Sequence, residues 1–65
     1  MNWTQIEGKW DQMKGEVRRQ FGKLTEDDLT EARGNRDKIV GKIKERYGVA
    51  KEDAERQLDA WMKKH

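Results

Sequence analysis

The sequence GKWDQMKGEVRRQFGKLTED at residues 8–27 returns in a related form, GNRDKIVGKIKERYGVAKED, at residues 34–53. The two stretches align without a gap at an offset of 26 residues, so that Gly8 falls on Gly34. A repeat of this length is typical of a supersecondary unit that packs against its own copy. We therefore expect two copies of one helix–turn–helix unit, at about residues 3–32 and 33–63. The matching pairs are Gly8 and Gly34, Asp11 and Asp37, Met13 and Ile39, Gly15 and Gly41, Val17 and Ile43, Phe21 and Tyr47, Gly22 and Gly48, Glu26 and Glu52, and Asp27 and Asp53.

The first half of each unit has the apolar spacing of a long amphipathic helix. Apolar residues recur every three or four positions, which places them on one face of an α-helix. This spacing predicts one helix over about residues 3–21 and another over about residues 35–47. The apolar face of the first carries Trp3, Ile6, Trp10, Met13, Val17 and Phe21, and that of the second carries Ile39, Val40, Ile43 and Tyr47.

The second half of each unit predicts a shorter helix. Thr25 and Asp28 have the spacing of a capping box, which would begin a helix over about residues 26–32. The last predicted helix covers about residues 51–63. Its apolar face consists of Ala54, Leu58, Trp61 and Met62.

Glycines mark the ends of the two long helices. Gly22 and Gly48 each follow an aromatic residue, at the position where a left-handed cap would end the helix. Glycine adopts that conformation without the steric penalty of a Cβ atom. We therefore expect breaks near residues 22–25, 33–34 and 48–50.

The composition allows one small domain with a thin core. The chain has 65 residues, of which 32% are hydrophobic and 43% are charged, and its mean hydropathy is −1.34. A domain of this size buries only about 60% of the surface that its unfolded chain exposes. We expect an all-α fold of four helices, in which both hairpins pack around one core within a single domain of residues 1–65.

The residue inventory argues against catalysis. The chain has no cysteine and no serine, and its one histidine is the terminal residue, His65. A nucleophile needs a nearby base, and a chain end holds an imidazole poorly in place. The acidic pairs at residues 27–28 and 52–53 suit the positive ends of helix dipoles, and no cluster has metal-ligand spacing. We expect a non-enzymatic protein with no cofactor and no metal.

The sequence also lacks the pattern of a membrane protein. It has no long apolar run and no signal-like apolar stretch at its start. We expect no membrane contact, residence in the cytoplasm and a monomeric state. The partner is unknown from sequence, although a protein partner fits this composition better than a nucleic acid does.

Basic charge on the third predicted helix is the most suggestive functional pattern. Residues 33–48 contain six basic and two acidic residues, a local charge of +4. Lys38, Lys42 and Arg46 follow one another at i,i+4 spacing, and such a column can contact phosphates. Residues 25–32, however, carry a charge of −4. An acidic second helix that pairs with the basic third helix inside the molecule is therefore the favoured interpretation.

Tryptophans and helical glycines leave further alternatives open. Trp3, Trp10 and Trp61 all fall on apolar faces, which favours core packing over a stacking platform for bases.

Three glycines fall on outward helical faces, although glycine costs about 1 kcal/mol relative to alanine inside a helix. Neutral drift on a solvated surface, close approach of a partner and deliberate lability all explain these glycines, which are Gly8, Gly15 and Gly41.

One segment resembles a known family. Residues 22–28, GKLTEDD, are similar to the central G-K-L-T-x-D-D segment of the CsbD-like family of small bacterial general stress proteins. Further matches, within a similarity that runs from about residue 3 to residue 61, are Lys14-Gly15, Gly34, Asp37, Gly41, Tyr47-Gly48 and Ala54. The resemblance implies two orthogonally packed helical hairpins related by an approximate internal duplication, as in SAM-like and helix-hairpin-helix domains. It implies no catalytic residue and no ligand.

Two hypotheses about function follow from these observations. The first is a stress-associated accessory protein that protects other macromolecules or binds a protein partner without chemistry. The second is a nucleic-acid-binding module that uses Lys38, Lys42 and Arg46 on the third helix.

Overall fold

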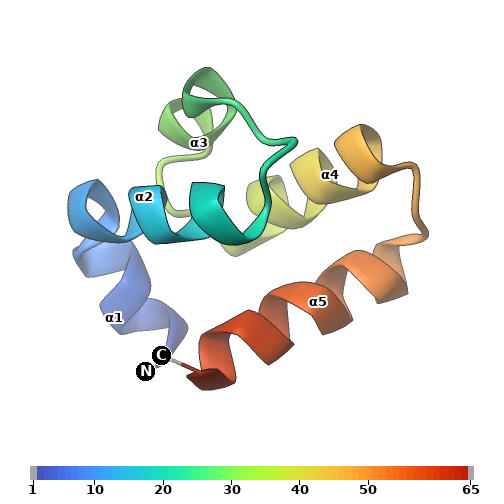
Figure 1. Ribbon diagram of the computed structural model, residues 1–65. Helices are drawn as coiled ribbons and strands as arrows, with labels where there is room; N and C mark the ends of the chain where they lie inside the picture. Colours follow the sequence, from blue (N-terminus) through green and yellow to red (C-terminus); the bar gives the residue numbers. More distant parts are fainter. Residues whose placement is uncertain (1, 65) are drawn as a thin grey trace.

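The computed structural model describes residues 2–64, and every regular element in that range is an α-helix (Figure 1). The prediction of an all-α fold is confirmed. The helices are α1 (Trp3–Gly8), α2 (Trp10–Gln20), α3 (Glu26–Ala32), α4 (Arg36–Tyr47) and α5 (Lys51–Lys64).

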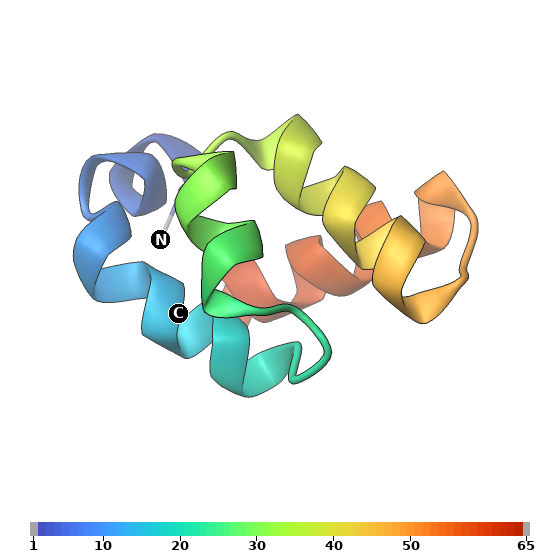
Figure 2. The same cartoon turned by 90° about the horizontal axis from the view of Figure 1, so that it is seen from above.

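The helices enclose one core. Helices α2 and α4 lie between α3 on one side and α5 on the other, as the two perpendicular views show (Figures 1 and 2). Each helix contributes buried residues, so the apolar faces predicted from the spacing meet in one cluster. The buried apolar residues are Ile6, Trp10, Met13, Val17, Phe21, Leu24, Leu29, Ala32, Ile39, Val40, Ile43, Ala54, Leu58 and Trp61.

The prediction of one helix over residues 3–21 is wrong, because the chain leaves the helical conformation at Lys9. This residue has φ −113° and ψ 30°, and its N–H is shared between the carbonyls of Gln5 at 3.1 Å and Ile6 at 3.2 Å. Helix α2 then begins at Trp10. The described chain thus has five helices and not four. The bend turns α1 back onto the core, where Ile6 becomes fully buried.

Helix α1 has its own cap, which the periodicity did not reveal. The Asn2 side chain accepts a hydrogen bond from the Gln5 N–H at 2.9 Å, and the Gln5 side chain accepts one from the Asn2 N–H at 3.1 Å. This reciprocal pair is a capping box and satisfies two N–H groups that would otherwise lack partners.

The predicted capping box of α3 is confirmed. The Thr25 hydroxyl accepts from the Asp28 N–H at 3.1 Å, and the Asp28 carboxylate accepts from the Thr25 N–H at the same distance. The breaks near residues 22–25, 33–34 and 48–50 are also present. Helix α4 starts at Arg36, with Asn35 as its N-cap, and α5 runs to Lys64.

The two glycine caps turn out differently. Gly48 has φ 65° and ends α4 in the predicted left-handed conformation. Gly22 is not left-handed, because the positive φ values among the described residues occur at Arg33, Gly34 and Gly48. Helix α2 ends instead through a turn that the Leu24 N–H closes on the Phe21 carbonyl at 3.0 Å, and this turn buries Leu24.

Gly34 is the glycine at which an added side chain would meet other atoms of the described chain. Its φ is 79°, and a Cβ atom placed there would lie 3.2 Å from the Cα of Glu7 and 3.4 Å from Cδ2 of Trp10. Both the backbone conformation and the space therefore require glycine. The turn between α3 and α4 depends on this residue to approach α1.

We predict that alanine at the three outward glycines stabilises the protein. Gly8, Gly15 and Gly41 are exposed and helical, and a Cβ atom at each would meet no heavy atom within 4 Å. Each substitution should raise the free energy of unfolding by about 0.5–1 kcal/mol and the melting temperature by roughly 4–8 °C. Thermal melts followed by circular dichroism test this, and a lower melting temperature in any variant contradicts it.

Gly34→Ala should have the opposite effect. The strained φ and the contact with the Glu7 backbone should together lower the free energy of unfolding by about 1–3 kcal/mol. Urea denaturation of Gly34→Ala beside Gly41→Ala makes a matched comparison, since the two variants gain the same methyl group. Equal urea midpoints for the two variants would contradict this prediction, because they would show that the turn accepts a side chain without loss of stability.

Candidate functional site

The basic column of α4 faces the acidic helix α3. Arg46 lies in the last turn of α4, and its guanidinium donates from Nε and from one terminal nitrogen to the two oxygens of Asp28, both at 3.0 Å. Lys42, one turn earlier, places its Nζ 3.6 Å from Asp28 and 3.4 Å from Glu31. The favoured interpretation from sequence, that the two helices pair inside the molecule, describes these contacts.

Asp28 is the centre of this arrangement. Its side chain is 5% exposed, and its carboxylate accepts hydrogen bonds from Arg46 and from the Thr25 N–H. The hydrogen bonds from Arg46 hold the pKa of the Asp28 carboxyl well below its usual range, and those from Thr25 act in the same direction. Burial opposes this shift but is outweighed. Asp28 is therefore a carboxylate at every pH at which proteins ordinarily work.

The three residues of the predicted nucleic-acid contact differ in their availability. Lys42 is largely covered and Arg46 is bound to Asp28, so both contribute little free positive charge to the surface. Lys38 is exposed, and no carboxylate of residues 2–64 pairs with its ammonium group. The structure thus leaves one open cation where the sequence suggested three.

A second ion cluster joins α4 to α5. One terminal nitrogen of the Arg36 guanidinium donates to Asp59 at 2.9 Å, and the other lies 3.7 Å from Glu55. The hydrogen bond to Asp59 raises the pKa of Arg36, so this group stays charged. Sequence reasoning missed this cluster, because the partners are more than fifteen residues apart and only the packing of α4 on α5 brings them together.

The tryptophans serve as core residues and anchors. Trp10 and Trp61 are 8% and 2% exposed, which leaves no open ring face for stacking on a base. The indole N–H of Trp10 donates to the Leu29 carbonyl at 2.9 Å, and that of half-buried Trp3 donates to the Gly34 carbonyl at 2.8 Å. Both bonds tie the first two helices to α3 and the turn after it.

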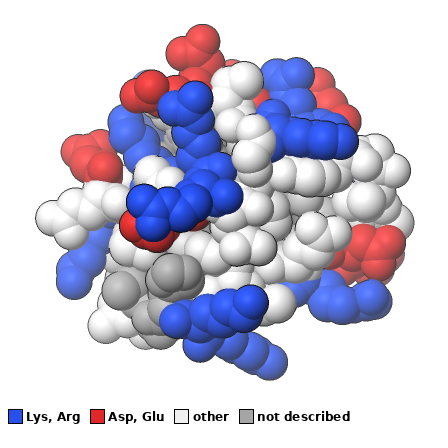
Figure 3. All heavy atoms as spheres, in the orientation of Figure 1, with Lys and Arg blue, Asp and Glu red and all other residues white. Residues whose placement is uncertain are grey.

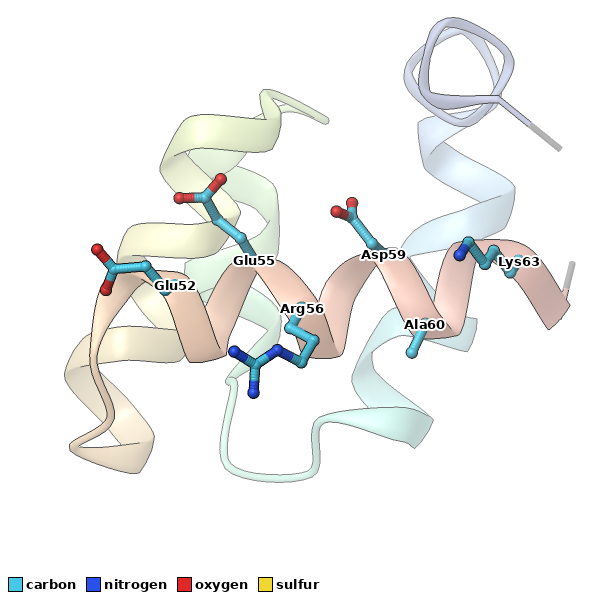
Figure 4. A pocket seen from close by; sticks show the side chains of 6 residues that line it. All are labelled: Glu52, Glu55, Arg56, Asp59, Ala60 and Lys63. Carbon is cyan, nitrogen blue, oxygen red and sulfur yellow. The ribbon is translucent and has the colours of Figure 1, made fainter.

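Residues of α5 line one hollow on the surface. It runs along the outer face of α5, with charged side chains of both signs around Ala60 (Figure 4). Glu55 and Asp59 lie on the same side of α5 and point away from Arg56 in this view, and both carboxylates are occupied by Arg36. Within residues 2–64 no group of three or more acidic, histidine or cysteine side chains is placed to hold a metal ion. His65 lies outside the described residues.

No helix within residues 2–64 has the length and apolarity needed to cross a bilayer. The longest, α5, has 14 residues and carries charges along its length.

Asp28→Asn should destabilise the protein in a pH-dependent manner. The folded-state pKa of Asp28 lies below its unfolded value, so its stabilisation is complete above about pH 4–5 and is lost as the pH falls towards the folded pKa. We expect a loss of about 1–3 kcal/mol at pH 7 that shrinks as the pH falls below about 4. Urea denaturation across this range measures it. Asp27→Asn, an exposed neighbour in the same helical turn, is the control and should change little.

Comparison with known proteins agrees with the sequence resemblance. The CsbD-like family model matches residues 4–56. The UPF0337 protein YjbJ of Escherichia coli O6:H1 is 52% identical over 65 residues, which cover 100% of this chain and 94% of that protein. A UPF0337 protein of Pectobacterium atrosepticum is 51% identical over 65 residues, with the same coverage. A UPF0337 protein of Protochlamydia amoebophila is 46% identical over 65 residues, which cover 100% of this chain and 98% of that protein.

These names state no reaction, ligand or partner, and all three organisms are bacteria. The family match covers most of the chain. It includes the capping box of α3, the pairing of α3 with Lys42 and Arg46, and the contact of Arg36 with Glu55. The chain therefore belongs to the CsbD-like family, as its GKLTEDD segment predicted.

Proposed function

We propose that this protein is a stress-associated accessory protein that acts without chemistry, by shielding or binding other proteins in the cytoplasm. Membership of the CsbD-like family supports the link to stress. The high charge and low mean hydropathy support a highly soluble chain that can accumulate without associating. The proposed unit of function is a single domain of residues 1–65.

The observation that carries this proposal is the neutralisation of α4 by α3. A phosphate-binding surface needs several free cations in a row. Here Asp28 and Glu31 bind Lys42 and Arg46. On the face that Figure 3 shows, acidic and basic side chains both occur, and uncharged residues fill the area to the right of the centre. Such a surface favours weak contacts with proteins over a nucleic-acid backbone.

Absence of enzymatic activity is part of the proposal. Its support is the lack of serine and cysteine in the chain, together with the roles that the acidic residues already have. Asp28 caps α3 and binds Arg46, and Asp59 binds Arg36. These carboxylates hold the fold together, which leaves them unsuited to proton transfer with a substrate.

We also infer that the fold is an internal duplication at the offset of 26 residues, in the manner of SAM-like and helix-hairpin-helix domains. Equivalent core places support it, since Val17 and Ile43 are both fully buried and Met13 and Ile39 are both buried. Phe21 and the partly buried Tyr47 meet edge to face, with ring centroids 6.4 Å apart. The units differ where α1 bends at Lys9. The duplication predicts that α2–α3 superposes on α4–α5.

Protection of a client protein is the direct test. We predict that an excess of this protein reduces the light scattering of a heated model enzyme more than an equal mass of an inert protein does. The assay temperature must lie below the melting temperature of the protein itself. Equal scattering in both samples would refute the protective role.

Nucleic-acid binding is the alternative, and the exposed Lys38 is the observation that favours it. Phosphate contacts would give a steep fall of affinity with salt, with a slope near −0.9 per contact on duplex DNA. We predict no shift of labelled DNA or RNA in a gel at low salt with micromolar protein. Lys38→Ala and Lys44→Ala form a matched pair, because both remove an exposed lysine of α4. Binding that is lost in the first variant and kept in the second would establish the alternative.

A further inference from the structure

Helix α1 contributes one buried residue, Ile6, whereas each of the other described helices contributes three. It has six residues, whereas a helix needs about 12–15 residues to be even marginally stable in water without partners. It lies at one end of the molecule in both views (Figures 1 and 2). Its helical form therefore depends on its contacts with the rest of the chain.

The junction between α1 and α2 has the features of a hinge. Lys9 lies outside helical geometry, so the hydrogen-bond ladder does not run straight from one helix into the next. Gly8 precedes it, with open space where a side chain would be. The capping box of Asn2 and Gln5 closes the start of α1 from within the segment itself. Rotation about Lys9 can thus move α1 without changing its internal hydrogen bonds.

The contacts that hold α1 lie over one apolar site. Ile6 is fully buried, and the Trp3 indole binds the Gly34 carbonyl. The turn at Gly34 packs close to the Glu7 backbone of α1 and to the Trp10 ring, since a Cβ atom at Gly34 would lie within 3.4 Å of both. Departure of α1 would empty the place of Ile6 and uncover the Trp10 ring beside Gly34.

We infer that α1 is a detachable lid over a binding site for apolar segments of partly unfolded proteins. It opens about Lys9 while α2–α5 stay folded. The site normally holds the aliphatic side chain of Ile6 and the aromatic ring of Trp3, so it accepts a short segment with side chains of the same kind. Burial of such side chains stabilises the complex for the same reason that it stabilises the docked lid. The binding step rests on the proposed protective function.

Hydrogen exchange of the full chain tests the lid separately from the client. In the wild type, amides of α1 should exchange faster than the most protected amides of α2–α5. Trp3→Phe removes the hydrogen bond to Gly34 and keeps an aromatic ring. It should speed exchange in α1 by about five- to tenfold and leave α2–α5 unchanged. Trp10→Phe removes the equivalent bond to Leu29 inside the core and should speed exchange in every helix.

A second variant guards against an indirect effect of the ring change. Asn2→Ala removes the cap of α1 without touching the core, and it should also speed exchange in α1 selectively. Exchange at one common rate in all helices of the wild type would overturn the lid. Equal acceleration of all helices in Trp3→Phe and Asn2→Ala would do the same.

The second part of the test measures how well each variant protects the heated model enzyme from aggregation. Trp3→Phe and Asn2→Ala should protect it better per mole than the wild type does, because the lid opens more often. Gly41→Ala, a stabilising change on α4, is the control and should match the wild type. Local opening of α1 combined with no protection by any variant would refute the proposed function. Protection by the wild type that the two lid variants leave unchanged would refute the binding site under the lid.

Discussion

The Asp28 carboxylate, buried between α3 and α4, is the constraint on which much of this structure depends. Removing a charge from water is costly unless the charge is paired and hydrogen-bonded. Thr25 supplies the bond that begins α3, and Arg46 supplies two bonds from the end of α4. One side chain therefore fixes both where α3 starts and which face of α4 it meets. A helix of seven residues would not persist without such ties on either side.

The same contact shapes what the surface can do. Because Arg46 and Lys42 turn towards α3, two of the three cations in the basic column of α4 are paired with carboxylates. The cations that could contact phosphates therefore hold α3 against α4 instead. The chain keeps a high content of charged residues, 43%, with a net charge of only +2.

Local patterns in the sequence predicted more than long-range geometry. The apolar spacing correctly identified the buried faces, and the capping box at Thr25 located the start of α3, because both depend on neighbours within a turn or two. The break at Lys9 escaped prediction since apolar residues keep the same spacing on both sides of it. The burial of Asp28 escaped for another reason. It depends on the register between α3 and α4, which no short-range pattern specifies.

The two indole hydrogen bonds attach α1 and α2 to the rest of the molecule in different ways. Trp10 reaches the Leu29 carbonyl on α3, so α2 is joined to a helix that Asp28 already fastens to α4. Trp3 reaches only the turn at Gly34, beyond the end of α3. Loss of the Trp10 bond therefore weakens an element held from several sides, and its cost spreads through the thin core. Loss of the Trp3 bond weakens an element at the edge that already bends at Lys9. The order in which helices open follows from this difference in attachment.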